Sequence, residues 1–355
     1  MSVRRASHAG SWYTDDGEQL DRQLQGWLDA VPAAVKEIPE AAPGGREGSK
    51  EEEEEEEARL PLRGVRAIIG PHAGLEYSGA TAAFAYKSIA TEGIRRVFVL
   101  GPSHHVYLKQ CALSQCAEYE TPLGSMAVDR ETIAELRRKS PEWGSMGLAV
   151  DEDEHSLEMH LPYIYKQFER RIDEVKLVPI LVGNLSLERE RAYGRLLAEY
   201  LEDEENLFVV SSDFCHWGSR FRYTRYRESD GARVVSLSAA KGLVSGGVPI
   251  WKSIERLDFD GMQAIARLDH AEFRRYLDET ENTVCGRHPI GVLLGAVAHL
   301  HPEQQADSSG RKIGDQGRGP QLRFVKYAQS SRVRDASDSS VSYASAYLRL
   351  PPKDA

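Results

Sequence analysis

Short apolar runs alternate along the chain with segments in which apolar residues recur every three or four positions. The short runs are typical of strands and lie at Val65–Ile69, Val97–Leu100, Leu177–Val182, Leu207–Val210, Leu322–Tyr327 and Val341–Leu348. The periodic segments are typical of helices and lie at Glu18–Leu28, Thr81–Ile89, Arg130–Arg138, Leu187–Leu201, Met262–Leu268, Ala271–Asp278 and Ile290–Leu300. Several of the short runs lack polar alternation, which indicates a sheet covered on both faces. The pattern therefore predicts an α/β fold with three layers, α/β/α, around a mixed central sheet.

Three segments interrupt this pattern, at about residues 32–61, 229–249 and 302–320. The first contains the unbroken run Glu51–Glu57, which repels itself and has nothing to bury. The other two are rich in glycine, serine and polar residues. We therefore predict one domain over residues 1–355 with three surface insertions.

Composition and charge exclude several classes of protein. Hydrophobic residues make up 41% of the chain and charged residues 28%, which is enough apolar material for a sizeable core. A net charge of -10 argues against a general binder of nucleic acid or of anionic membranes. No apolar run is long enough for a membrane span, and four scattered cysteines make no disulfide framework. We expect a protein of the reducing compartments, the cytoplasm or the nucleus.

Three strand-like runs each lead into a short polar cluster with a histidine. The clusters lie at residues 70–74, 101–105 and 211–218, and they contain His72, His104 and His216. Neutral imidazole is a common ligand of transition metals, and the ends of parallel strands converge at one edge of a sheet. The repetition predicts a shared site, although each histidine alone would more often be a core or surface residue.

The third cluster places Asp213 close to His216. An aspartate beside an imidazole suits acid/base catalysis or the orientation of a metal ligand, so both residues are candidates for a catalytic role. The alternative is that Asp213 only caps the following turn.

The acidic segment 151–162 contains two histidines but does not match a zinc-protease helix. His155 and His160 are five residues apart, whereas His-Glu-x-x-His places its two ligands four apart on one helix face. His155 and Glu158 are three apart and could face one cleft. The simpler alternative is an acidic helix start favoured by the helix dipole.

Cys285 is followed by Gly286 and Arg287, just before an apolar helix. Nearby positive charge and backbone donors favour a thiolate, although a lone cysteine is more often a small core residue. Cys111 and Cys116 lack such neighbours and are interpreted as structural. Near the N-terminus, Trp12 could line the rim of a pocket or plug the core.

These motifs together resemble the Memo proteins, mediators of ErbB-driven cell motility. The strings that carry the resemblance are Ala-Ser-His-Ala-Gly-Ser-Trp-Tyr (6–13), Pro-His-Ala-Gly (71–74), Leu-Gly-Pro-Ser-His-His (100–105), Asp-Glu-Asp-Glu-His-Ser-Leu-Glu-Met-His-Leu-Pro-Tyr (151–163), Ser-Ser-Asp-Phe-Cys-His-Trp-Gly (211–218) and Cys-Gly-Arg-His-Pro-Ile-Gly-Val-Leu-Leu (285–294). The resemblance covers nearly the whole chain except the three insertions.

The resemblance implies the fold of class III extradiol ring-cleaving dioxygenases. It also implies one copper or iron ion per chain, held by His72, His104 and Cys285, with Asp213 and His216 close by. Phosphotyrosine-type peptides or receptor tails are the implied partners. The residues matching the peptide-binding positions are Trp12, His72, His104, His216 and Cys285. Family members are linked to signalling, cell motility and invasive growth, in the cytoplasm and the nucleus.

One departure from the dioxygenase pattern changes the expected chemistry. Those enzymes use two histidines and a carboxylate, whereas Cys285 would supply a softer sulfur ligand. We therefore expect a redox-active metal protein rather than a ring-cleaving enzyme. The competing hypothesis is an adaptor without catalytic activity that binds a phosphotyrosine-type peptide at a vestigial pocket.

Overall fold

The computed structural model describes the whole chain except residues 1, 39–56, 230–231, 238–246, 303–318 and 352–355. The strands are β1 (Val3–Arg4), β2 (Ala34–Lys36), β3 (Glu57–Arg59), β4 (Val65–Gly70), β5 (Arg96–Pro102), β6 (Cys111–Ser114), β7 (Glu118–Thr121), β8 (Gly124–Ala127), β9 (Gly144–Met146), β10 (Lys176–Val182), β11 (Asn206–Ser211), β12 (His216–Trp217), β13 (Arg225–Tyr226), β14 (Val235–Ser236), β15 (Gln321–Gln329) and β16 (Ser340–Arg349). The helices are α1 (Gly17–Ala30), α2 (Leu75–Lys87), α3 (Arg130–Lys139), α4 (Leu148–Asp153), α5 (His155–Glu158), α6 (Leu161–Phe168), α7 (Leu187–Glu202), α8 (Ile250–Ala266), α9 (His270–Thr280) and α10 (Arg287–Leu300), with 3-10 turns η1 (Glu169–Glu174) and η2 (Ser219–Phe221).

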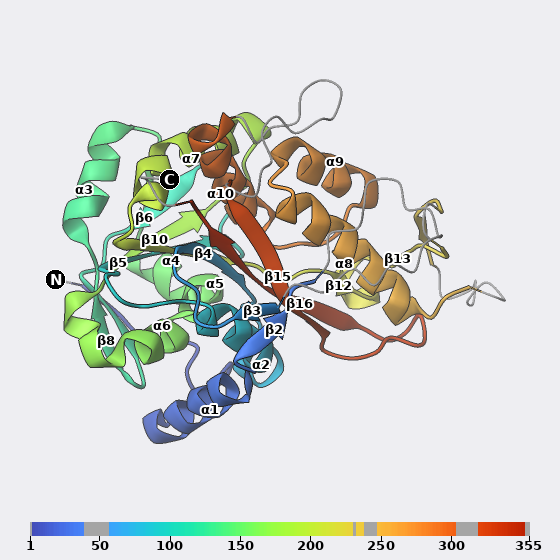
Figure 1. Cartoon of the computed structure of the whole chain (residues 1–355), viewed down its shortest axis with the longest axis horizontal. Helices are drawn as coiled ribbons and strands as arrows, with labels where there is room; N and C mark the ends of the chain where they lie inside the picture. The colour runs from blue at the N-terminus through green and yellow to red at the C-terminus, as the bar shows by residue number, and fades with distance from the viewer. Residues whose placement is uncertain (1, 39–56, 230–231, 238–246, 303–318, 352–355) are drawn as a thin grey trace.

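A mixed sheet forms the centre of the molecule (Figure 1). Its strands follow the order β12-β16-β4-β11-β5-β10-β6-β9, and β15 pairs with β16 on the side. The four strands β4, β11, β5 and β10 are parallel, whereas β16 and β6 join them in the antiparallel sense. The predicted mixed sheet is therefore confirmed.

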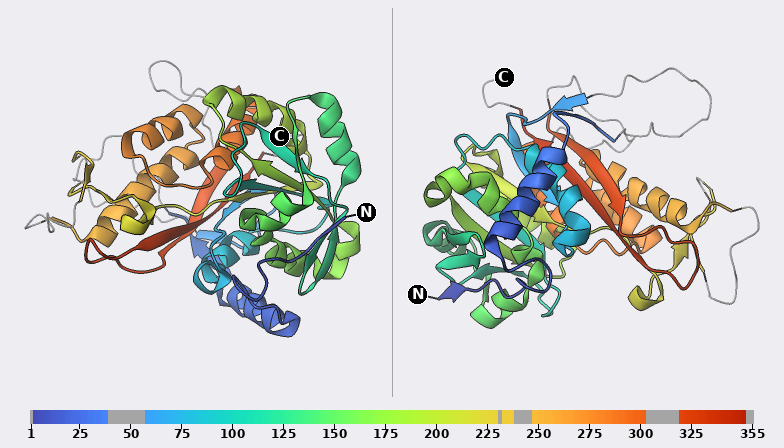
Figure 2. Two further views of the ribbon diagram at one scale, coloured as in Figure 1. Left: turned by 180° about the vertical axis from the view of Figure 1, so that it is seen from behind. Right: turned by 90° about the horizontal axis from the view of Figure 1, so that it is seen from below.

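Helices cover both faces of this sheet, as predicted. Helices α7 and α10 pack on β5 and β11 from one side, while α2 packs on β4 and β16 and joins α1 and α6 on the other (Figure 1). Every residue of β4 and of β11 is buried, which explains why their sequences lack polar alternation. Figure 2 shows that α8 and α9 lie together beside β15 and β16, far from α3. No helix in the described part of the chain is both long and apolar enough to cross a membrane.

Local sequence defines where the main helices begin. Helices α1, α3, α7 and α9 each begin with a capping side chain that accepts a hydrogen bond from the backbone N–H of the third helical residue; the caps are Asp16, Asp129, Ser186 and Asp269. In α1 the apolar residues Leu20, Leu24 and Leu28 recur every four positions and are all buried. Caps and periodicity therefore agree on these elements.

The predicted surface insertions are only partly described. The two ends of the segment 32–61 are paired strands: β2 and β3 form an antiparallel ribbon in which Val35 and Ala58 are buried. The prediction of a loop is wrong for these ends, because each supplies an apolar residue to the core. Within 229–249, β14 pairs with β13. The remainder of the three insertions, including nearly all of 302–320, lies outside the described residues.

Two helices begin six or more residues earlier than the sequence pattern predicts. Helix α2 begins at Leu75 instead of Thr81, and α8 begins at Ile250 instead of Met262. Gly79 has a low helix propensity, which obscured the start of α2. Glycine is required at this position because a Cβ would lie 2.5 Å from the Trp27 ring. Charged residues between Ile250 and Leu257 obscured the start of α8, although both apolar residues are buried on one face.

Helices α7 and α10 cross at a point where their backbones touch. A Cβ placed on Gly194 of α7 would lie 2.5 Å from the backbone nitrogen of Ala296 and 2.8 Å from the carbonyl oxygen of Val292, both in α10. Backbone cannot move aside as a flexible side chain can. Glycine at 194 therefore sets the distance between two helices that cover one face of the sheet.

We expect Gly194→Ala to lower the free energy of unfolding by about 1–3 kcal/mol, because the added methyl group forces α7 and α10 apart. Gly26→Ala is the matched control, since Gly26 lies in helix α1 with nothing within 4 Å of an added Cβ. That control should raise the stability by about 0.5–1 kcal/mol. Urea unfolding of both variants tests the pair, and equal effects of the same sign would refute the close crossing.

Candidate functional site

The candidate site lies where three parallel strands end. His72 follows β4, His104 follows β5, and Asp213 and His216 follow β11. Because these strands are parallel neighbours, their carboxyl ends meet at one edge of the sheet. Cys285 reaches the same edge from the segment that precedes α10. The structure therefore brings all five of these sequence-predicted residues to one region.

His72 is buried and its protonation state follows from its neighbours. Its Nδ1 lies 2.6 Å from Oγ of Ser211, and that hydroxyl donates its own proton to the carbonyl of Ser156 at 2.8 Å. The Nδ1 of His72 must then carry a proton, which leaves a lone pair on Nε2. Burial, followed by the neighbouring imidazoles of His104 and His155, lowers the pKa of His72 well below its usual value. The ring is therefore neutral, and the lone pair on its Nε2 faces Cys285.

His104 is oriented by a carboxylate. Both its backbone nitrogen and its Nδ1 donate to Glu154, at 2.7 and 2.8 Å. Burial opposes ionisation of Glu154, but the hydrogen bonds from His104 and Ser156 outweigh it and lower the pKa of Glu154 to about 2. The ionised carboxylate fixes the proton of His104 on Nδ1, so the Nε2 of His104 is the atom that faces the site.

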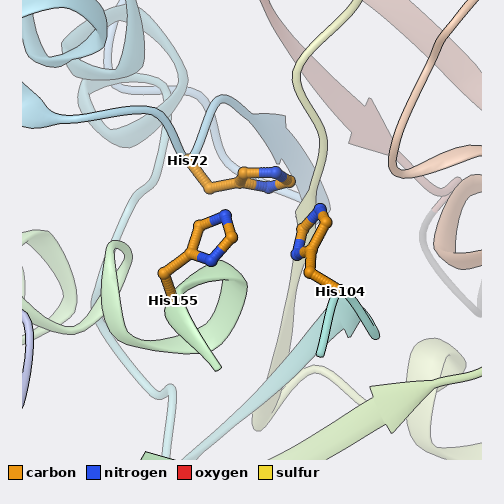
Figure 3. A group of neighbouring side chains, drawn as sticks. All are labelled: His72, His104 and His155. Carbon is orange, nitrogen blue, oxygen red and sulfur yellow. The ribbon is translucent and has the colours of Figure 1, made fainter. Parts of the chain in front are cut away.

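His155 joins these two histidines, which the sequence analysis did not predict. One nitrogen from each of His72, His104 and His155 lies within 4.8 Å of the others, and Figure 3 shows the three rings converging from different elements. His155 opens α5, stacks on His104 at 4.3 Å between ring centroids, and its Nδ1 is buried without a hydrogen-bond partner. Burial, with the adjacent His104, lowers the pKa of His155 to about 3.

No spacing within its own segment identifies His155 as a member of this group. The sequence analysis tested the acidic segment only for ligands within one helix, and it rejected the pair His155 and His160 correctly. His160 points into the core, where its Nδ1 lies 2.8 Å from the hydroxyl of Tyr86. An acidic residue that orients a histidine on another strand cannot be recognised from spacing within its own segment.

Cys285 lies next to His72, but as a thiol. Its Sγ is 3.1 Å from Nε2 of His72 and accepts a hydrogen bond from the backbone N–H of Asp213 at 3.2 Å. Burial raises the pKa of Cys285 well above its usual value and the charge of Asp213 adds to the rise, against the smaller effect of Arg287. The expectation of a favoured thiolate is therefore wrong for the protein without a metal, because burial outweighs the cation.

Asp213 and His216 have different roles in the structure. Asp213 is buried, and its Oδ1 accepts hydrogen bonds from the backbone nitrogens of His72 and Ala73 at 2.9 and 3.3 Å. These backbone groups belong to the loop after β4 and not to the turn that follows Asp213, so the capping alternative does not describe these contacts. His216 directs Nδ1 to the carbonyl of Phe214 at 2.9 Å, which leaves Nε2 for the cavity that the residue lines. Of the two, His216 is the better placed for acid/base chemistry.

A cavity of about 450 Å³ opens onto these residues. Its lining comprises Trp12, His72, Ala73, Tyr77, His104, His155, Asp213, His216, Arg220, Phe221, Ser330, Ser339, Ser340, Val341 and Tyr343. Trp12 is 37% exposed and its ring lies 4.4 Å from His155, so it forms part of the rim. The neighbouring Tyr13 is buried and donates to Glu158. Trp12 therefore lines the rim of the cavity, whereas Tyr13 packs in the core.

A buried ion network anchors this N-terminal segment, and the sequence analysis missed it. The fully buried Arg4 contacts Asp151 at 3.0 Å and Glu158 at 2.7 Å. Glu158 also accepts from the Nδ1 of His8 at 2.8 Å. Burial opposes ionisation of Glu158, but His8 and Arg4 outweigh it and lower the pKa of Glu158 to about 2. The network holds Trp12 against the cavity.

The start of α10 is anchored in a similar way. Glu190 of α7 is buried between two histidines, with Nε2 of His270 at 2.7 Å and Nδ1 of His288 at 2.6 Å. His288 lies three residues after Cys285, so this contact ties the cysteine segment to α7.

The donor atoms fit a transition metal. Two imidazoles with fixed Nδ1 protons and a sulfur atom form a set that suits copper, iron or zinc, and not magnesium or calcium. Among the described residues, the side chains whose ligand atoms all lie within 4.8 Å of one another are His72, His104 and His155, and Cys285 is not one of them. The rim around this set contains Trp12, Arg220 and several serines, which suits a ligand with both aromatic and anionic parts.

Comparisons with known proteins give one consistent answer. The sequence model of the Memo family, whose description is Memo-like protein, matches residues 4–347 of this chain. The chain is 46% identical to Protein MEMO1 of Danio rerio over 348 residues, which cover 98% of each protein. It is 44% identical to Protein MEMO1 of Homo sapiens, covering 98% of this chain and 97% of the relative. Protein memo-1 homolog of Caenorhabditis elegans is 39% identical over 99% of this chain and 83% of its own.

One solved structure is similar at a lower level. The uncharacterized protein JW3007 from Escherichia coli K12 is 12% identical, with a TM-score of 0.40, and the match covers 78% of this chain and 98% of that one. A likeness of this degree carries no argument about the site.

The buried His160 gives the protein a defined response to acid. Burial lowers the pKa of His160 from 6.5 to about 3, so the unfolded chain binds a proton between these values that the folded chain does not. Stability is therefore complete above pH 6.5 and falls as the pH decreases toward 3. We expect His160 alone to lower the free energy of unfolding by about 2 kcal/mol between pH 7 and pH 5. Urea unfolding of wild type and His160→Asn measures this, and equal pH slopes in both proteins would contradict it.

Proposed function

Because the chain belongs to the Memo-like protein family, we propose that it is a redox-active protein that binds one copper or iron ion through His72, His104 and Cys285. The observation that supports this ligand set is the position of the Cys285 sulfur, 3.1 Å from the Nε2 of His72. A soft sulfur beside two neutral imidazoles stabilises Cu(I) and still accepts Cu(II) or Fe(II).

The residues around this set prepare it for a metal. Ser211 and Glu154 hold protons on the Nδ1 atoms of His72 and His104, so both Nε2 lone pairs face the site without rearrangement. The thiol of Cys285 must lose its proton on binding, and the backbone N–H of Asp213 stabilises the resulting charge. A bound copper or iron ion would supply one-electron redox chemistry.

The wider role follows from the family resemblance. We propose a function in signalling, cell motility or invasive growth, in the cytoplasm and with the nucleus as a second location. The exposed rim of the cavity supports a link between the metal site and a partner, since Trp12 and Arg220 lie on that rim beside the three histidines.

That rim also supports a second candidate function, an adaptor without catalytic activity. A phosphotyrosine-type peptide or receptor tail would place its ring against Trp12 and its phosphate near Arg220. His72, His104, His216 and Cys285 would then form the floor of a peptide site. The two hypotheses differ in whether the protein needs a metal.

We expect Cys285→Ser to weaken copper binding on the order of 100-fold and to abolish metal-dependent redox activity, because the hydroxyl is a poor ligand for Cu(I). Cys111→Ser is the control: Cys111 is buried in β6, and its loss should change neither property. The measurement is copper and iron titration of both variants against a competing chelator.

The variant His155→Asn tests whether the third ligand is Cys285 or His155. If Cys285 is the ligand, this variant retains most of the copper affinity. Equally tight stoichiometric binding by Cys285→Ser and wild type would remove sulfur from the site and favour the adaptor.

We expect no cleavage of catechols at rates typical of enzymes, on the order of 1–1000 per second, because a sulfur atom stands where ring-cleaving enzymes have a carboxylate. Oxygen-electrode traces of the iron-loaded protein with catechol test this. Sustained oxygen uptake at such a rate, absent in His104→Asn, would overturn it.

A further inference from the structure

A second cavity, larger than the first, lies beside α8 and α9. Its volume is about 820 Å³, and its lining comes from β13, residues 232–234, the second half of α8 and the length of α9. It shares no lining residue with the metal-type cavity. In Figures 1 and 2, α8, α9 and β13 lie together, apart from α3 and α6. The cavity is therefore a separate feature that the proposed function does not use.

Arginine dominates the wall of this second cavity. Five arginines and three carboxylates line it, which gives a net charge of +2 in a chain whose total net charge is -10. The arginines are Arg225, Arg227, Arg233, Arg267 and Arg275. A local excess of positive charge in an acidic protein concentrates anions at this place.

Three of these arginines are held in position by carboxylates at the edge of the cavity. Arg227 contacts Asp260 at 2.5 Å, and Arg267 forms two bonds to Glu272 at 3.0 and 2.5 Å. Arg225 pairs with Glu281. A guanidinium has five N–H donors in a planar fork, so an ion pair with a carboxylate orients the whole group. Less side-chain entropy is then lost when the ligand binds.

Two observations show that donors remain without partners. The Nε of Arg227 is buried and has no hydrogen-bond partner among the described residues. Arg233 and Arg275 are exposed on the wall, and neither forms an ion pair with any carboxylate that the structure describes. The exposed guanidinium groups of Arg233 and Arg275 can therefore donate hydrogen bonds to an anionic ligand in the cavity.

The dimensions and charge identify the class of ligand. A volume of about 820 Å³ lies within the roughly 300–1,000 Å³ range of small-molecule sites. The overall negative charge disfavours a long polyanion such as nucleic acid, because most of that polymer would lie against acidic surface. Guanidinium forks match phosphate oxygens two at a time, and Val234 and Ala264 supply apolar wall for an organic part.

We propose that this arginine cavity binds a small phosphorylated molecule that carries at least two negative charges. The fixed arginines Arg225, Arg227 and Arg267 form the base of the anion site. Arg233 and Arg275 contact the phosphate groups from two separate chain segments. Binding here is independent of the metal at His72 and His104.

Calorimetric titration of the full-length protein with inorganic pyrophosphate, at about 150 mM salt to screen non-specific attraction, tests the proposal. We expect saturable binding at one site per chain. The double variant Arg233→Ala/Arg275→Ala should weaken it by about tenfold or more, the effect of losing charge-assisted hydrogen bonds. Copper affinity should not change, which separates this result from any failure of the proposed function.

The matched control is Arg222→Ala/Arg274→Ala. It removes the same charge from neighbouring positions: Arg222 follows η2, and Arg274 is adjacent to Arg275 on α9 but pairs with Asp278, and neither lines the cavity. Retained binding in this control supports the site. Equal loss in both double variants, or no saturable binding of pyrophosphate, would overturn the proposal. Citrate that binds as tightly as pyrophosphate would overturn the assignment to phosphate.

Discussion

One buried carboxylate, Glu154, holds two of the three chain segments that supply the imidazoles of the metal-type site. It accepts hydrogen bonds from the backbone and the ring of His104, which follows β5, and from the backbone of Ser156 at the start of α5. His155 lies between Glu154 and Ser156 in sequence, so the contact that orients His104 also fixes the residue that stacks on it. Since the carboxylate is buried, removing its partners would leave an unpaired charge in the core, and this cost keeps the arrangement in one form.

Much of the fold could be read from the sequence because the parallel strands are buried on both faces. Their uninterrupted apolar runs and the caps of α1, α3, α7 and α9 are local signals, and such signals can be recognised in a single sequence. The same reasoning placed His72, His104 and Asp213 at one sheet edge. It failed where a signal is spread over distant residues: the buried Arg4 that pairs with Asp151 and Glu158, and the ribbon β2–β3, both depend on contacts between remote segments.

The chemistry of the site was harder to predict than its position. Gly286 and Arg287 are the correct neighbours for a thiolate, but the pKa of Cys285 is governed by burial, which sequence does not reveal. His155 was considered only with His160 and Glu158 of its own segment, whereas its neighbours in the site, His72 and His104, follow β4 and β5. Residue identity therefore predicted which groups meet, and the three-dimensional environment decides which protons they keep.

The hydrogen bonds from His72 through Ser211 to the carbonyl of Ser156 run in a single direction, each group donating to the next. Dipoles aligned head to tail polarise one another, so the imidazole of His72 gains electron density at Nε2. That density makes His72 a stronger σ-donor than an isolated imidazole would be. The accepting carbonyl belongs to the backbone of α5, so the electronic character of the site depends partly on where the main chain places that helix.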